Sequence, residues 1–147
     1  MTKGHHTFDH ALQEANIWLK AVEKQLHCSE HEAYQALRVT LHALRDRLPQ
    51  ENAVKLAAQL PMLIRGVFYE GWQMGGTTSD LHNAEEFSRR VKDDLPVGFP
   101  LDGKAVAKGV FEVLWERLDP GESAKITDLL SPSLRHLWPE ISLRKHG

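Results

Sequence analysis

Apolar residues near the start of the chain recur at alternating intervals of three and four residues. The residues with this spacing are Phe8, Leu12, Ala15, Leu19, Val22 and Leu26. Because an α-helix turns once every 3.6 residues, such spacing places their side chains on one stripe. The pattern predicts a helix over residues 8–27, with one apolar face and with Thr7 as its N-cap.

Signals for helix starts and ends divide the following segment into three more helices. Ser29 begins a Ser-x-x-Glu capping box, in which each side chain satisfies a free amide of the first helical turn. The second helix begins there and is expected to end at Pro49. A shorter helix is expected over residues 52–60. Pro61, which has no amide donor, suits the first turn of a fourth helix that runs to Trp72.

The middle of the chain interrupts the helical pattern with glycines and small polar residues. Residues 73–82 offer almost nothing to bury and are expected to form a flexible linker. Beyond this linker the order of helix signals returns. Asn83 begins a second capping box, Asp119 caps a short helix, and Ser131 with the following proline opens the last helix.

The second half of the sequence resembles a copy of the first half. A shift of 70 positions matches residue types in helical phase, as in Leu44 with Leu114, Lys55 with Lys125, Leu60 with Leu130 and Arg65 with Arg135. The pattern predicts a duplicated helical unit. Because each unit alone would bury only a marginal core, the two are expected to pack on each other about an approximate twofold axis.

The predicted fold is therefore all-α, a helical bundle made of two pseudo-repeated helical units packed on each other. The first unit is expected over residues 8–72 and the second over residues 83–139, joined by the linker at residues 73–82. Residues 1–7 are expected to form a flexible N-terminus and residues 140–147 a C-terminal tail.

Composition and charge exclude several classes of partner. Of the 147 residues, 41% are hydrophobic and 26% are charged, which is typical of a folded globular domain. The formal net charge is −2 and no predicted helix is consistently basic, so nucleic acid is not an expected partner. The longest apolar window, residues 56–64, is shorter than the ~20 residues of a membrane span, so a membrane is not expected either.

Cysteine content and the first residues of the sequence bear on location. Cys28 is the only cysteine, so the chain cannot form an internal disulfide. The first residues lack the apolar stretch of a signal peptide. Both observations lead us to expect a cytoplasmic protein.

Histidines gather near this cysteine and near the N-terminus, but their spacing does not predict a metal site. Residues 27–31 include two histidines, which the capping box at Ser29 assigns to different helices. Structural zinc sites usually collect four ligands in spaced pairs, and the chain has no second cysteine. His5, His6 and His10 are interpreted as parts of a frayed polar N-terminus. We expect neither a metal nor a cofactor.

The main candidate binding site follows one face of the fourth predicted helix. Spacings of four and three residues place Arg65, Tyr69 and Trp72 side by side, away from the apolar face. A guanidinium beside two aromatic rings allows cation–π contacts and has the composition of a binding hot spot. Arg135 and Trp138 repeat part of this row, so pseudo-symmetry would place both sets at one cleft. In the alternative interpretation, the aromatic rings complete a core that each arginine covers with its methylene stem.

Weaker candidates lie on the second predicted helix. Arg38, His42 and Asp46 are four residues apart, and Arg45 lies beside them. An aspartate that orients a histidine is the beginning of acid/base catalysis, but no serine or cysteine nucleophile is tied to this pair by spacing. The same arrangement is typical of a solvent-exposed helix face with i,i+4 pairs, and we favour that interpretation. No catalytic residue is assigned.

Five segments of the chain carry a resemblance to a known family. They are Ala33-Tyr-Gln-Ala-Leu-Arg38, Leu41-His-Ala-Leu-Arg-Asp-Arg-Leu48, Leu56-Ala-Ala-Gln-Leu-Pro61, Leu63-Ile-Arg-Gly-Val-Phe-Tyr-Glu-Gly-Trp72 and Leu134-Arg-His-Leu-Trp-Pro139. In this order they resemble the domain-of-unknown-function family 2267, over about residues 8–139. The resemblance implies a small all-helical bacterial protein, and it implies no activity, cofactor or catalytic residue.

The expected function is that of a non-catalytic protein-interaction or self-association module, which binds another protein or its own copy. Helix-capping and packing signals are plentiful, and no catalytic set is assembled by spacing. A small anionic ligand, held by Arg65 and Arg135 in a cleft between the units, is the alternative. An enzyme is the least favoured class, because P-loop, dinucleotide-binding and nucleophile-elbow patterns do not occur in the sequence.

Overall fold

A computed structural model describes residues 3–73 and 83–139 of the chain. Every regular element in these two ranges is helical, so the predicted all-α fold is confirmed. The elements are α1 (Lys3–Leu26), α2 (Glu30–Arg47), α3 (Gln50–Ala58), α4 (Met62–Tyr69), α5 (Ala84–Asp94), α6 (Gly103–Arg117), α7 (Pro120–Leu129) and the 3₁₀ turn η1 (Leu134–Leu137). The predicted linker, except for Gln73, and the predicted tail at 140–147 lie outside the described residues.

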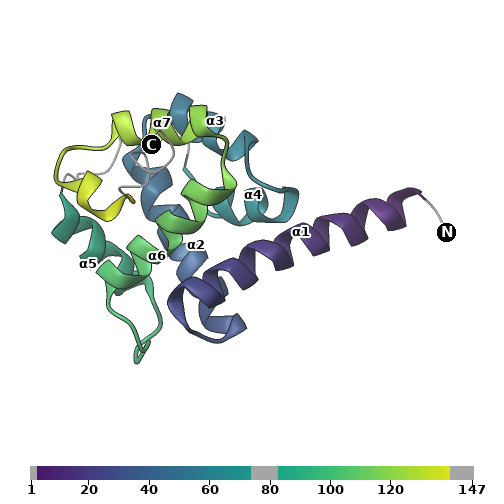
Figure 1. Cartoon of the computed structure of the whole chain (residues 1–147), viewed down its shortest axis with the longest axis horizontal. Helices are drawn as coiled ribbons and strands as arrows, with labels where there is room; N and C mark the ends of the chain where they lie inside the picture. Colours follow the sequence, from purple (N-terminus) through teal and green to yellow (C-terminus); the bar gives the residue numbers. More distant parts are fainter. Residues whose placement is uncertain (1–2, 74–82, 140–147) are drawn as a thin grey trace.

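Helices α2 and α6 form the centre of the molecule. They contact each other, and both are buried over most of their length. Helix α1 packs on α2, α4 and α6, and α5 packs on α6 and α2. Figure 1 shows that α1 runs outward from this body, so that its N-terminal part stands clear of it.

Two glycines allow α6 to approach its neighbours closely. A Cβ atom at Gly103 would overlap the backbone carbonyl of Ser88 on α5, and a Cβ atom at Gly109 would overlap the side chain of Leu26 on α1. Both glycines are buried. Since α1 precedes the mid-chain segment and α6 follows it, the contact at Gly109 joins the two halves of the chain. Buried apolar residues of both halves form one hydrophobic cluster.

Most of the helix-capping signals are confirmed. The Ser29 hydroxyl accepts a hydrogen bond from the backbone of Glu32 at 3.1 Å, and the Glu32 carboxylate accepts one from the backbone of Ser29 at 2.9 Å. Asn83 and Asp119 each accept a bond from the amide three residues later, at 2.8 and 3.0 Å. These caps begin α2, α5 and α7 where the sequence indicates.

Some predicted boundaries are wrong. Helix α1 begins at Lys3, so Thr7 lies inside the helix and does not cap it. A cap contributes only about 1 kcal/mol, so a helix can extend past a potential cap residue. Helix α4 ends at Tyr69 rather than at Trp72, because Gly71 adopts a left-handed conformation with φ of 71° that stops the helix. The last element is a 3₁₀ turn of four residues instead of an α-helix.

Candidate functional site

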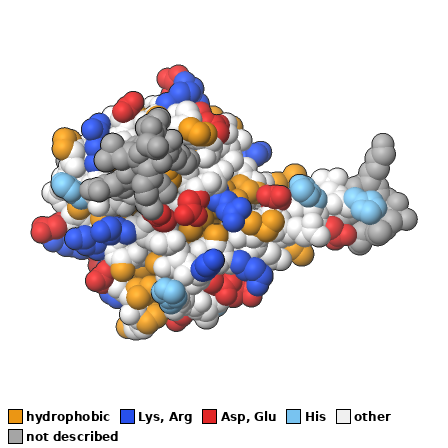
Figure 2. All heavy atoms as spheres, in the orientation of Figure 1, with side chains coloured by type: hydrophobic (Ala, Val, Ile, Leu, Met, Phe, Trp, Pro, Cys, Tyr) orange, Lys and Arg blue, Asp and Glu red, His pale blue; other side chains and the backbone are white. Residues whose placement is uncertain are grey.

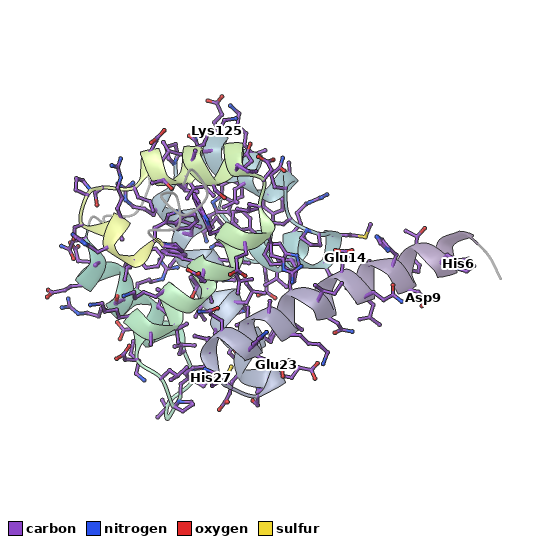
Figure 3. The ribbon with its side chains drawn as sticks, in the orientation of Figure 1. His6, Asp9, Glu14, Glu23, His27 and Lys125 are labelled. Atoms are coloured by element: carbon purple, nitrogen blue, oxygen red, sulfur yellow. The ribbon has the colours of Figure 1, made fainter. Side chains whose placement is uncertain are left out.

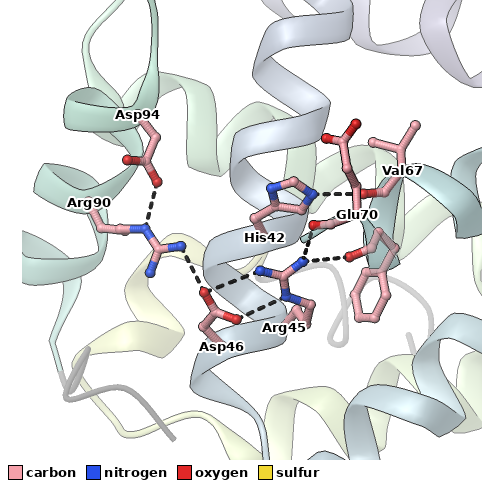
Figure 4. A network of polar contacts seen from close by, with 8 residues as sticks. His42, Arg45, Asp46, Val67, Glu70, Arg90 and Asp94 are labelled. Atoms are coloured by element: carbon pink, nitrogen blue, oxygen red, sulfur yellow. Dashed lines mark hydrogen bonds and ion pairs between the residues drawn. The ribbon is translucent and has the colours of Figure 1, made fainter. Parts of the chain in front are cut away.

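The polar face of α2 is buried, so the solvent-exposed interpretation of these residues is wrong. His42 is 9% exposed and Arg45 is 6% exposed, while Arg38 and Asp46 are half-buried. Helices α4 and α5 pack against α2, which the periodicity of α2 alone does not indicate. Arg38 also donates to the carboxylate of Glu70 at 2.7 Å. We call Arg38, His42, Arg45 and Asp46 the α2 polar cluster. Figure 4 shows the last three of these residues with their partners.

Two members of the cluster bind the carboxyl end of α4. Arg45 Nη1 donates to the carbonyl oxygens of Phe68 and Glu70, both at 2.9 Å. His42 Nε2 lies 2.7 Å from the carbonyl oxygen of Val67, and because a carbonyl only accepts, Nε2 carries the proton. The last carbonyls of a helix lack partners within the helix and carry partial negative charge, so a cation stabilises them. The cluster therefore anchors the end of α4 to α2.

Asp46 connects α2 to α5 through two arginines. It accepts hydrogen bonds from Arg45 at 2.9 Å and from Arg90 at 2.8 Å, and Arg90 also donates to Asp94 at 2.6 Å. Burial alone would raise the pKa of Asp46, but the hydrogen bonds from the two arginines hold that pKa below its usual value. For Arg90 the signs are reversed. Burial alone would lower its pKa, but its hydrogen bonds to Asp46 and Asp94 raise that pKa above its usual value. Paired charges thus join α2 to α5.

His42 is held as a structural donor rather than as an acid/base catalyst. Burial is the main cause that lowers its pKa; the hydrogen bond to Val67 opposes this effect, and the charges of Arg45 and Arg38 add to it. The ring is therefore neutral at neutral pH. Asp46, the carboxylate considered as its orienting partner, is hydrogen-bonded to arginines. The cluster has the residue types of a catalytic site and the geometry of a clamp between helices.

Arg65 and Arg135 each bind the end of a preceding helix. Arg65 donates from Nε to the carbonyl oxygen of Ala57 at 3.1 Å and from Nη2 to that of Leu60 at 3.0 Å. Arg135 makes an equivalent pair of bonds after α7, at 3.0 and 3.2 Å. In both places a guanidinium adds a charged donor to carbonyls at a helix end, where the partial negative charge favours a cation.

The aromatic residues of the predicted row belong to two separate parts of the core. Tyr69 and Trp72 stack with ring centroids 5.5 Å apart, and both are partly buried against the core. Trp138 is buried against Phe111 and Trp115, with centroid distances of 5.0 and 6.1 Å. Trp138 also lines a pocket to which no other member of the row contributes. Ligand binding by the row stays a prediction.

That pocket lies where the two halves of the chain meet and has a volume of about 490 Å³. Leu26 at the end of α1, Lys108 of α6 and His136 of η1 contribute to its lining, together with Trp138. Gly109, where α1 and α6 approach closely, also lines the pocket. The pocket combines apolar walls with polar side chains of both charges, since Glu112 lines it together with Lys108 and His136.

The residues around Cys28 do not assemble a reactive site. His27 has a φ of 54° and ends α1, whereas His31 belongs to α2. Burial raises the pKa of the Cys28 thiol, and the charges of Glu32 and Glu23 raise it further, so the thiol stays protonated and unreactive. Among the described residues, no three His, Cys, Asp or Glu side chains are grouped to hold a metal ion.

The first turns of α1 expose large apolar side chains, a feature that the sequence analysis missed. Phe8 is 70% exposed and Leu12 is 54% exposed, although Val22 and Leu26 of the same stripe are buried. Figure 2 shows α1 as an arm that stands out from the body, so Phe8 and Leu12 are exposed although Ala11 between them is buried. We call Phe8, Leu12 and the half-buried Leu19 the α1 ridge. The stripe itself was visible in the sequence, but its lack of a cover was not.

Comparison with known proteins assigns no activity. A family model described as "Uncharacterized conserved protein (DUF2267)" matches residues 15–137, which confirms the resemblance found in the sequence. No curated protein matches the chain. In the two described ranges, we find no helix with the length and apolar character needed to cross a membrane. The bacterial origin and the cytoplasmic location stay predictions.

Proposed function

Because the chain belongs to the DUF2267 family, whose description gives no activity, we propose a function from the structure: a non-catalytic protein-interaction module. The observation that carries the proposal is the α1 ridge, where Phe8 and Leu12 are exposed four residues apart on a projecting helix. Apolar side chains gathered on one exposed face mark interaction sites, and helices dock through anchors at such spacing. The side chains of the α2 polar cluster, in contrast, make their hydrogen bonds to groups of the same chain.

Photo-crosslinking in cells tests this proposal. A photoreactive phenylalanine analogue at position 8 is expected to give a covalent adduct with a protein, because Phe8 lies on the interaction surface. The same analogue at Glu116, which is exposed on α6, is the matched control and is expected to give none. If position 8 gives no protein adduct, or no more than the control position, the proposed function is wrong.

The contacts of Arg65 and Arg135 support the further proposal that the chain is a duplicated unit. Arg65 bonds to the carbonyls of residues 57 and 60, and Arg135 bonds to those of residues 127 and 130. All three members of one contact are 70 positions from those of the other, the shift that aligns the two halves of the sequence. Duplication of an ancestral unit predicts that residues and their contacts repeat at the same interval, as they do here.

The pocket between the halves supports a second candidate function, the binding of a small anionic ligand. Lys108 supplies positive charge beside the apolar surface of Leu26 and Trp138, and Glu112 is the acidic residue of the same lining. Calorimetric titration with succinate and with inorganic phosphate tests this candidate. Binding that Lys108→Met abolishes and Lys125→Met leaves intact would support it, since Lys125 is exposed on α7 and is not part of the lining. Equal loss in both variants, or no binding to the wild type, would overturn it.

A further inference from the structure

We infer that the partner of the α1 ridge is a second copy of this chain, bound with the two α1 helices antiparallel. The inference rests on the proposed function, because it identifies the partner of the same surface. In the pair, Phe8 of each copy occupies a hollow beside Leu19 of the other copy. The argument comes from the shape of α1, the register of its side chains and their charges.

The hollow and the side chain that fills it lie on the same side of α1. A cavity of about 400 Å³ opens between α1 and α2, lined by Leu19 of α1 and by Glu30, His31 and Tyr34 of α2. Leu19 and Tyr34 give it an apolar floor, and the other two residues give it a polar rim. Phe8 and Leu19 are eleven residues apart, which is close to three full turns, so both face the same way.

A single antiparallel register places Phe8 of each copy beside Leu19 of the other copy. When the twofold axis passes midway between residues 13 and 14 of α1, Phe8 is level with Leu19 of the other copy. In the same register Leu12 is level with Ala15 of the other copy, a small residue that is buried in its own chain and adds no contact of its own. A twofold pair is self-complementary and closed, which is the commonest arrangement of protein dimers.

Charges beside the ridge favour the same register. Asp9 follows Phe8 and Lys20 follows Leu19, so the two charged residues lie on one flank of the ridge. In an antiparallel pair the same flanks of the two helices face each other, and Asp9 comes within about 3 Å of the level of Lys20 along the helix axis. Asp9 therefore meets Lys20 twice, once on each side of the twofold axis, at a flank where Glu23 and Glu30 also lie beside Lys20.

The shape of the molecule leaves room for the second copy. Figure 3 shows His6, Asp9 and Glu14 along the projecting part of α1, and Glu23 and His27 at the end that joins the body. In the antiparallel pair, the body of one copy lies beside the first turns of α1 of the other copy. The turns before Ala11, which is the first buried residue in the described part of α1, extend beyond the described body of their own copy and leave space beside them (Figure 1).

Sedimentation equilibrium over a range of concentrations tests the pairing. The wild type is expected to approach twice the chain mass of 16.7 kDa. Phe8→Asp is expected to weaken the dimer by about 100-fold or more, because two aromatic rings lose their buried contacts. Ile17→Asp is the matched control, since Ile17 is 43% exposed and lies two and a half turns from Phe8, on the opposite side of α1. Circular dichroism verifies that each variant is helical.

Charge reversal tests the register. Lys20→Asp is expected to weaken the dimer several-fold, because two like-charged pairs replace two opposite pairs. Adding Asp9→Lys to the same chain is expected to restore the wild-type affinity, since opposite charges face each other again. If the double variant dimerises no better than Lys20→Asp alone, the antiparallel register is wrong.

Two results would overturn the self-pairing. One is a wild-type protein that stays monomeric at several hundred micromolar, and the other is a dimer that Ile17→Asp disrupts and Phe8→Asp does not. If the wild type is monomeric while position 8 crosslinks to a different protein, self-pairing fails and the interaction module stands. If the wild type is monomeric and position 8 gives no adduct, both proposals fail.

Discussion

Helices α2 and α1 both depart from the usual placement of polar side chains in solvent and apolar side chains in the core, and they do so in opposite ways. Helix α2 buries charged groups, with Arg45 6% exposed, whereas α1 exposes a phenylalanine and a leucine in its first turns. Both helices have clear amphipathic sequences. The interpretation of the α2 polar face was wrong, whereas the stripe predicted for α1 is present but its first turns are exposed. The α2 polar cluster was expected in solvent, and the α1 stripe was expected to form one apolar face.

The difference teaches that periodicity tells which residues share a face, and that neighbouring helices decide what covers it. Helix α2 contacts α1, α4, α5 and α6, so its polar face also becomes an interface. There each charge is retained with a partner, as buried charges must be. Helix α1 extends beyond the helices that pack on it, so Phe8 and Leu12 at the start of its apolar stripe are exposed to solvent (Figure 2). The first case stabilises the fold, and the second leaves a surface for a partner.

Removing the central guanidinium of the α2 polar cluster is expected to have the largest effect on stability. Arg45→Met leaves the carbonyls of Phe68 and Glu70 without their donor and takes one partner from Asp46. Breaking a buried charge network in this way costs about 3–5 kcal/mol. Urea unfolding measures the free energy, with Arg89→Met on the exposed side of α5 as the control. A loss below about 1 kcal/mol would contradict the role of a clamp.

The two helix-end arginines are expected to have smaller and equal effects. Arg65→Ala and Arg135→Ala each remove two charge-assisted hydrogen bonds at a partly exposed site, at a cost of about 1–2 kcal/mol. Lys55→Ala, which removes only an exposed pair with Glu51, is the control. Thermal unfolding of the three variants measures the costs. Clearly unequal costs for the two arginines would count against the duplicated unit.

The pH dependence of stability isolates His42. Because its pKa is lower in the fold than in the unfolded chain, the unfolded chain takes up the proton first as the pH falls below ~6.5. Stability is therefore lost from that pH down to the pKa of the folded state. His42→Gln keeps a donor for the Val67 carbonyl and removes the titration, so its stability relative to the wild type should rise by up to about 1 kcal/mol between pH 7.5 and pH 5. Parallel curves for the two proteins would contradict this account.

The α1 ridge is expected to contribute almost nothing to the folding of a single chain. Phe8→Ala and Leu12→Ala should change the free energy of unfolding by less than about 0.5 kcal/mol at concentrations where the chain is monomeric. Phe68→Ala, which truncates a fully buried ring, should cost about 3–5 kcal/mol in the same assay. A cost above about 1 kcal/mol for Phe8→Ala would show that the ridge is packed within its own chain.

The fold was predictable because its signals are local. Capping residues such as Ser29 and Asp119 act within one turn, and apolar spacing acts within one helix, so the elements and their order follow from short segments. The start of α1 was missed because caps are weak signals, and the helix continues through Gly4, His5 and His6, which are not strong helix formers. The early end of α4 depends on the left-handed conformation of Gly71.

The candidate site was only half predictable, because its contacts join distant segments. The members of the α2 polar cluster were grouped correctly, but the Arg90 partner of Asp46 lies 44 positions away and no local pattern connects them. Arg65 offers a local signal that was not used, since it binds a carbonyl only eight positions back, at a helix end. The exposure of Phe8 depends on how far the helices that pack on α1 extend along it, which α1 itself does not encode.

Hydrogen–deuterium exchange at two protein concentrations tests the central claim most directly, that the α1 ridge is an interface and the α2 polar cluster is not. The comparison runs from low micromolar to several hundred micromolar. We predict that backbone amides of α1 around the ridge, and those beside the hollow at the start of α2, become more protected at the higher concentration, while α5 and α7 do not change. Protection that is independent of concentration in α1, or that rises in α5 and α7 instead, would contradict the account.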